Sequence, residues 1–230
     1  VVQRNSNRGV DDAKLYEIGS VFIPKEQPVI QEPYEKLKLC IGLSGKYDFY
    51  DIKGIVEALL QRLGIAVSLK ILEDNPTFHP GRSAAMYVNN ECIGIYGEAS
   101  AGTLYNYGLD NKVFLAEIDA EKLLEYKNTD WKYQPLPKYP AMVRDIAVIV
   151  RDNVPVGAMT EVISAVNPHL IESVELFDVY KGDHIEEGYK SCAFSITYRN
   201  KERTLKEKEV ENIHNKILDE LKKNFEAKLR

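Results

Sequence analysis

The stretch IESVELFDVYKGDHIEEGYKSCAFSITYR, residues 171–199, contains two β-rich segments separated by a polar, glycine-containing loop. Val, Ile, Phe, Tyr and Thr dominate the segments 171–180 and 189–199, and the loop KGDHIEEG can join them as a hairpin. Along the second segment, apolar residues alternate with small or polar ones and occupy positions Cys192, Phe194, Ile196 and Tyr198. This alternation is typical of a strand with one buried face.

The sequence on either side of this hairpin predicts two helices and two further strands. A strand at 143–151 and a helix at 155–166 precede it, and a long helix follows it. We expect Thr204 and Glu207 to form a capping box at the start of that helix. Its apolar stripe comprises Val210, Ile213, Ile217, Leu221 and Phe225. With a short strand in the closing AKLR, the order is βαββαβ, which predicts a ferredoxin-like fold whose antiparallel sheet has helices on one face only.

The other face of this sheet is expected to be open, and strand alternation predicts the side chains on it. In the last long strand these are Ser191, Ala193, Ser195, Thr197 and Arg199. In the strand before it, Phe177 and Val179 should face the helices. Asp178 and Tyr180 should then face the open side. A small, polar face with one aromatic residue at its edge is a surface on which a nucleic-acid base can stack.

The first part of the chain predicts a second, largely antiparallel sheet. Strands are expected at 14–22, 36–45, 66–72, 83–89, 92–98 and 112–119, the last of which closes the sheet. The sequence YDFYDIKGIVEALLQRLGI has apolar residues at helical spacing. It predicts a helix with Asp48 or Asp51 as its N-cap and Gly64 as the residue that ends it. A short helix is expected at 120–126. The proline-rich WKYQPLPKYP, residues 131–140, predicts a linker, so we divide the α+β chain into domains 1–136 and 137–230.

Composition excludes several classes of protein. Hydrophobic residues make up 44% of the chain and charged residues 28%, which is typical of a folded globular protein and not of a disordered or fibrous one. The net charge of −5 excludes a strongly basic polyanion-binding protein, so a nucleic-acid contact must use a local patch. Cys40, Cys92 and Cys192 are too far apart in sequence for a disulfide framework or a zinc site, and we expect buried thiols. No apolar run is long enough for a membrane span, and we expect a cytoplasmic protein that is a piece of a longer chain.

Candidate chemistry is sparse. His79, Arg82 and Glu98 could form a polar cluster, but a structural use is favoured over acid-base catalysis. The remaining histidines are scattered without ligand spacing, so we expect neither a catalytic residue nor a metal site. The run RNKERTLKEK, residues 199–208, has five basic and two acidic residues. It is either a solvated loop or a phosphate-binding patch whose candidate contacts are Arg199, Lys201 and Arg203.

Four motifs then occur in order: PKYPAMVRD (137–145), LFDVYKG (176–182), YKS (189–191) and RTLKEKEV (203–210). At these motifs the chain resembles the ferredoxin-fold anticodon-binding domain that ends the β subunit of bacterial phenylalanyl-tRNA synthetase. The earlier segments LYEIGSVF, FYDIKGIVEALL, TFHPGRSA and IGIYGE resemble the catalytic-like domain of that subunit, a class II synthetase fold without an active site. The family usually has a His-Pro pair after Gly97-Glu98, whereas this chain has Ala99-Ser100.

The resemblance implies a truncated class II synthetase-like domain that supports the α subunit, followed by a domain that binds the anticodon of tRNA(Phe). It implies that the whole enzyme is an α2β2 heterotetramer using ATP and magnesium, and that this piece needs no cofactor, DNA or membrane. In the family's motifs an anticodon base lies against the aromatic residue that is Tyr180 here, close to Ser191, and Ala141 offers a small surface for a base. Asp178, on the same predicted face, can accept hydrogen bonds from a guanine edge.

Two alternative functions remain open at this point. One is a free-standing RNA-binding module, because RNA-recognition domains share the βαββαβ order, although YKSCAFSITYR lacks their aromatic, glycine-rich signature. The other is an interaction scaffold without an RNA role. Salt-dependent binding of tRNA would distinguish the scaffold from the anticodon-binding domain and from the free-standing RNA-binding module.

Overall fold

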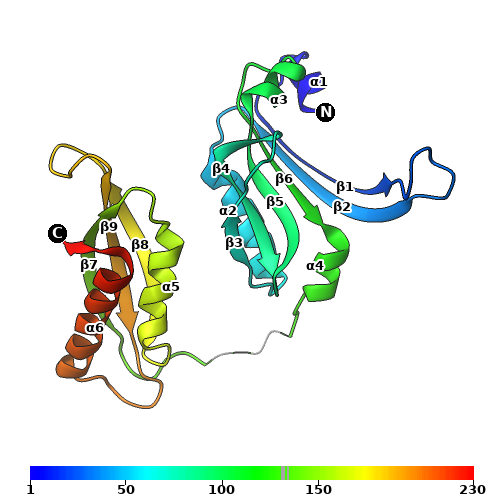
Figure 1. Ribbon diagram of the computed structural model, residues 1–230. Helices are drawn as coiled ribbons and strands as arrows, with labels where there is room; N and C mark the ends of the chain where they lie inside the picture. Colours follow the sequence, from blue (N-terminus) through cyan, green and yellow to red (C-terminus); the bar gives the residue numbers. More distant parts are fainter. Residues whose placement is uncertain (131–132, 134) are drawn as a thin grey trace. The chain divides into compact units, whose positions relative to one another are not determined.

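The computed structural model describes residues 1–130, 133 and 135–230, and the predicted linker at 131–140 therefore lies partly outside the described residues (Figure 1). The chain divides into two compact units, Val1–Lys132 and Tyr133–Arg230, which we call the first and second unit. Each unit has its own sheet and its own hydrophobic core.

The first unit is built around a six-stranded antiparallel sheet. Its strands are β1 (Ala13–Ile23), β2 (Tyr34–Ser44), β3 (Ser68–Ile71), β4 (Phe78–Val88), β5 (Glu91–Ala99) and β6 (Val113–Asp119), and its helices are α1 (Val2–Ser6), α2 (Phe49–Arg62), α3 (Ala101–Asn106) and α4 (Ala120–Tyr126). The strand order is β1-β2-β6-β5-β4-β3. The strand β6 therefore lies in the middle of the sheet and not at its edge, because it pairs with both β2 and β5.

Helix α2 confirms the periodicity seen in the sequence. The side chain of Asp48 accepts hydrogen bonds from the backbone N–H groups of Tyr50 and Asp51, at 2.7 and 3.0 Å, so Asp48 is the N-cap. After the helix, Gly64 takes a left-handed conformation with φ of 67°, which favours glycine and stops the helix. The face of α2 that carries Ile52, Val56 and Leu60 is buried against the sheet.

The second unit has the βαββαβ order. Its elements are β7 (Met142–Arg151), α5 (Val156–Val166), β8 (Ile171–Tyr180), β9 (Tyr189–Tyr198), α6 (Glu207–Phe225) and β10 (Lys228–Leu229). The antiparallel sheet has the order β10-β7-β9-β8, and α5 and α6 cover one of its faces (Figure 1). Its core includes the alternating side chains predicted for β9, namely Cys192, Phe194, Ile196 and Tyr198. The predicted ferredoxin-like fold is confirmed.

The start of α6 differs from the prediction. The helix begins at Glu207, and the carboxylate of Glu209 accepts a hydrogen bond from the backbone N–H of Lys206 at 2.9 Å. Thr204 does not cap the helix because the next residue, Leu205, is buried in the core and holds the preceding segment there. The guanidinium of Arg203 also binds Glu209 and lowers the pKa of that carboxyl to about 2.

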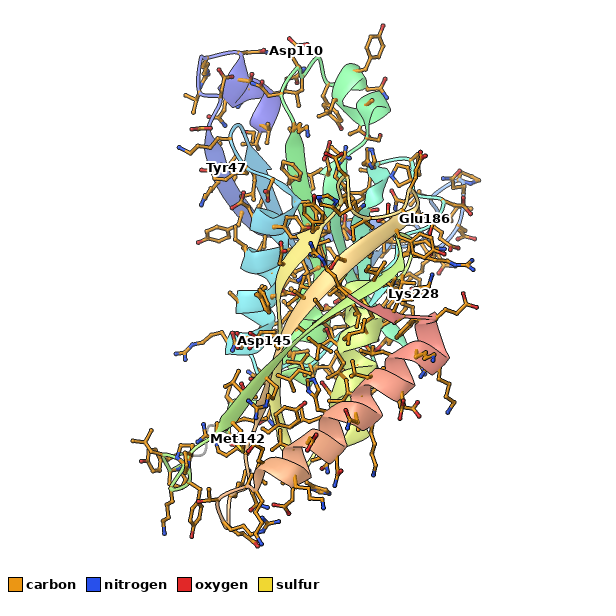
Figure 2. The ribbon with its side chains drawn as sticks, turned by 90° about the vertical axis from the view of Figure 1, so that its left-hand side faces the viewer. Tyr47, Asp110, Met142, Asp145, Glu186 and Lys228 are labelled. Atoms are coloured by element: carbon orange, nitrogen blue, oxygen red, sulfur yellow. The ribbon has the colours of Figure 1, made fainter. Side chains whose placement is uncertain are left out.

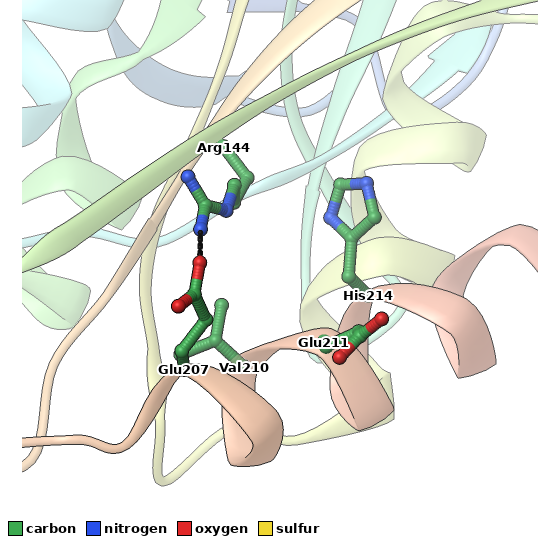
Figure 3. Close-up of a pocket in the computed structure, with 5 residues that line it drawn as sticks. All are labelled: Arg144, Glu207, Val210, Glu211 and His214. Atoms are coloured by element: carbon green, nitrogen blue, oxygen red, sulfur yellow. Dashed lines mark hydrogen bonds and ion pairs between the residues drawn. The ribbon is translucent and has the colours of Figure 1, made fainter.

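The packing of α6 on the sheet includes two polar contacts. The hydroxyl of Tyr198 lies 3.1 Å from Nδ1 of His214, and burial lowers the pKa of this histidine. Figure 3 shows Arg144 of β7 pointing to Glu207 of α6, and the two form an ion pair of 2.9 Å. These residues join the sheet to the helix, and His214 has a structural role.

Two expectations about side-chain burial are wrong. Cys192 is buried, but Cys40 and Cys92 are exposed, because β2 and β5 each have one face outside the core. Phe177 is 59% exposed because β8 contains a bulge: Leu176 pairs with Phe194 and Asp178 with Ala193, so Phe177 has no partner in the register. The bulge interrupts the alternation that had assigned Phe177 to the helix side.

Candidate nucleic-acid interface

The open face of the second unit has a narrow floor of small residues. The pairing places Tyr180 of β8 next to Ser191 of β9, which in turn pairs with Ile149 of β7. In the adjacent row, Asp178 pairs with Ala193, and Ala193 pairs with Ala147. Ser191 and Ala193 are only 2% and 9% exposed, so longer neighbouring side chains cover this floor, and a flat group beside Tyr180 must displace part of that cover.

The predicted site residues fall at two ends of this face. Tyr180, Asp178 and Ser191 lie together at one end. Ala141 and Arg199 lie at the other end, next to the pair Met142 and Tyr198. At about 3.3 Å per residue, the part of β9 from Ser191 to Tyr198 is about 23 Å long. Figure 2 shows the same separation along β7, with Met142 at one end and Lys228 near the other.

The ring of Tyr180 is held closely by the chain that follows it. Tyr180 is partly buried, and a Cβ atom added to Gly182 would lie only 2.7 Å from its Cζ atom. A side chain at position 182 would push against the phenol ring. Glycine at this position therefore allows the loop after β8 to pass over the tip of the ring.

The basic run at residues 199–208 is not a patch of free cations. Arg199 forms an ion pair of 2.9 Å with Glu172 and donates a hydrogen bond of 2.7 Å to the carbonyl oxygen of Tyr139. Arg203 forms a bidentate pair with Glu209 at 2.6 and 2.8 Å. Lys201 is exposed, and within the described part of the chain no ion pair of it is found. Two of the three predicted phosphate contacts are thus already paired with carboxylates.

In the first unit, the polar cluster is structural. The buried carboxylate of Glu98 accepts two hydrogen bonds from the guanidinium of Arg82, and this contact lowers the pKa of Glu98. The Nδ1 atom of His79 accepts a hydrogen bond from the backbone N–H of Gly81 at 3.0 Å. These contacts stabilise the pairing of β4 and β5 and the first residues of β4. Among the described residues, no group of three or more His, Cys, Asp and Glu could hold a metal ion, and no helix is long and apolar enough to cross a membrane.

The segment that departs from the family's Gly-Glu motif starts a helix. The hydroxyl of Ser100 accepts a hydrogen bond from the backbone N–H of Thr103 at 3.2 Å and caps α3. The same hydroxyl donates to the carbonyl oxygen of Pro76 at 2.7 Å. Ser100 therefore fixes the end of β5 against the loop before β4.

Comparison with known proteins gives matches in both units. Residues 137–230 match the family model described as ferredoxin-fold anticodon binding domain, and residues 1–120 match the one described as phenylalanyl tRNA synthetase beta chain CLM domain. The chain belongs to the phenylalanyl tRNA synthetase beta chain family. As a member of this family, it has the expected order of a synthetase-like domain followed by an anticodon-binding domain.

Individual proteins that are similar to this chain belong to the same phenylalanyl tRNA synthetase beta chain family. Phenylalanine–tRNA ligase beta subunit of Clostridium tetani is 42% identical over 100% of this chain and 29% of the relative's length. That of Clostridium acetobutylicum is 39% identical over 99% of this chain, and that of Halalkalibacterium halodurans is 37% identical over 100%. The chain spans 29–30% of the length of these three relatives.

The sequence did not identify every candidate residue on the open face. Lys228 and Arg230 come from the short strand β10 and its end. The AKLR segment was predicted as a strand, but its pairing with β7 was needed to place its side chains.

Proposed function

We propose that this chain is the C-terminal part of a phenylalanine–tRNA ligase β subunit and that its second unit binds the anticodon of tRNA(Phe). The observation that carries the proposal is the end of the open face formed by Tyr180, Ser191 and Ala193. A base can stack on the ring of Tyr180 above the small side chains of β9. The exposed carboxylate of Asp178 can accept hydrogen bonds from the edge of that base.

In this proposal the chain contributes binding and no covalent step. The whole enzyme joins phenylalanine to tRNA(Phe) with ATP and magnesium, and the reacting groups are bound by the α subunit. The ion pair of Glu98 with Arg82 and the hydrogen bond of His79 with the backbone of Gly81 in β4 support a scaffolding role for the first unit. An α2β2 assembly would bring two such chains together with two α subunits.

We place the α subunit on an apolar groove beside β1 in the first unit. Tyr16 and Ile18 pair with Ile41 and Leu39, whose side chains pack under α2, so all four lie on the same side of the sheet. Tyr16 is nevertheless 78% exposed and Ile18 57% exposed. The groove is lined by Leu15, Tyr16, Ile18, Leu43, Ile55 and Leu59. A continuous apolar surface of this kind is typical of a protein interface.

The docking proposal predicts a specific loss of association. Tyr16→Asp should weaken binding of the α subunit by at least about tenfold, because the carboxylate would lose its water in the apolar interface. Tyr105→Asp is the matched control, since Tyr105 is also largely exposed but lies on α3, outside the groove. Sedimentation velocity of the purified mixture measures both variants. Equal association of the two variants and the wild type would contradict the proposed docking surface.

Anticodon recognition is tested by titrating tRNA(Phe) and a version with an altered anticodon into the full-length protein that carries this chain. The binding free energy should be more favourable for tRNA(Phe) than for the altered tRNA by roughly 1–3 kcal/mol, the range for one mismatched or unstacked base. Both affinities should fall with rising salt concentration because phosphate contacts release counterions. Equal affinity for the two tRNAs would contradict anticodon binding, and the absence of salt-dependent binding would favour a scaffold without an RNA role.

A further inference from the structure

Arg230 reaches across the open face of the second unit and lies over Tyr180. The strands β10 and β8 are at opposite edges of the four-stranded sheet, which places them three strand spacings, or about 14 Å, apart. The guanidinium carbon of Arg230 is nevertheless only 5.2 Å from the centroid of the Tyr180 ring. The two long side chains therefore meet above the small residues of β7 and β9.

The backbone of β10 positions this arginine. Lys228 pairs with Ile149, and the backbone N–H of Arg230 donates a hydrogen bond of 3.0 Å to the carbonyl oxygen of Ala147. Ile149 and Ala147 lie on the open face, so the side chains of Lys228 and Arg230 lie on that face as well. The neighbouring Ala147, Ser191 and Ala193 are too small to block the path between Arg230 and Tyr180.

Arg230 is also one of few cations at this end of the sheet without a carboxylate partner. Lys181 is paired with Asp152 at 2.5 Å, and Arg151 is paired with Glu226 at 3.1 Å. Across the residues that the structure describes, neither Lys228 nor Arg230 forms an ion pair with a carboxylate. The contact of Arg230 with Tyr180 is a cation–π interaction, which leaves the positive charge of the guanidinium available to an anion.

We propose that Arg230 is a tRNA-binding residue that works together with Tyr180, an inference that rests on the proposed function of the second unit. In the free protein the guanidinium covers the face of the ring. When a base stacks on Tyr180, the guanidinium leaves the ring and binds the phosphate next to that base. The main cationic contact at the anticodon end of the sheet is then Arg230, directly after β10, and not Arg199 or Arg203, which are paired with carboxylates beyond the far end of β9.

The inference is tested in the full-length protein with tRNA(Phe) at several salt concentrations. Arg230→Ala should weaken binding roughly five- to tenfold and reduce the slope of log affinity against log salt by about 1. Arg230→Lys keeps the charge, so its slope should equal that of the wild type. Lys216→Ala removes an exposed charge from α6, which covers the opposite face of the sheet, and should change neither quantity. Equal melting curves of all variants confirm that folding is retained.

Three further outcomes would each contradict the inference about Arg230 or the proposed function. If Tyr180→Ala weakens binding while Arg230→Ala changes neither affinity nor salt slope, the inference about Arg230 is wrong and the proposed function stands. If Arg230→Ala and Lys216→Ala cause equal losses, Arg230 acts only through the overall charge, and the inference is again wrong. If the wild type does not distinguish tRNA(Phe) from the altered anticodon, the proposed function fails and the inference fails with it.

Discussion

Phe194→Ala is expected to lower the free energy of unfolding of the second unit by about 3–5 kcal/mol, the usual cost of removing a large buried aromatic side chain. Phe194 is fully buried on the central strand β9, in the core between the sheet and the two helices. The loss is a large part of the roughly 5–15 kcal/mol that stabilises a typical domain. The first unit has a separate core around Phe114 and should keep its own stability.

Hydrogen exchange followed by mass spectrometry measures this effect, because peptides from the two units report on each unit separately. Phe177→Ala is the matched control: it removes the same side chain from the neighbouring strand, where the ring is exposed, and should cost less than about 1 kcal/mol. If Phe194→Ala lowers protection equally in both units, the two units do not unfold independently, and the division of the chain into two folding units is wrong.

The regular part of the fold was predictable from local patterns. The alternation of Cys192, Phe194, Ile196 and Tyr198 determined which face of β9 is buried, and the apolar spacing of α2 determined its buried side. The features that were missed depend on tertiary contacts. Helices α1 and α3 have only five and six residues, too few for a periodic pattern. The start of α6 depends on the burial of Leu205, which no local motif indicates.

The candidate site was predictable as a set of residues but not as an arrangement. Alternation correctly placed Asp178 and Tyr180 on the side of Ser191, even though the bulge moved Phe177. Sequence alone could not show that Arg199 and Arg203 are paired with carboxylates, because Glu172 and Glu209 meet them only in the folded unit. The contact between Arg230 and Tyr180 depends on the pairing of the first and last strands of the unit.

Tyr180→Ala is expected to lower the affinity of the full-length protein for tRNA(Phe) by roughly 1–3 kcal/mol, the range for one base stacked on one aromatic ring. Tyr180→Phe keeps the ring and should lose less. Phe177→Ala is the control for a second exposed aromatic residue on the same strand, outside the row of Tyr180 and Ser191, and should lose less than Tyr180→Ala. Equilibrium titrations at constant salt concentration measure the three variants. A loss for Phe177→Ala equal to that for Tyr180→Ala would show that the base is not specifically on Tyr180.

The most direct test of the anticodon-binding surface compares Tyr180→Ala with Lys201→Ala on two tRNAs, tRNA(Phe) and a version with an altered anticodon. Lys201 is exposed at the far end of the sheet, so its loss should weaken binding of both tRNAs about equally or leave both unchanged. For Tyr180→Ala, we predict a loss of affinity on tRNA(Phe) that shrinks on the altered anticodon, because the stacked base is then already lost or misplaced. An equal loss on both tRNAs, or no loss on either, would contradict the assignment of this face to the anticodon.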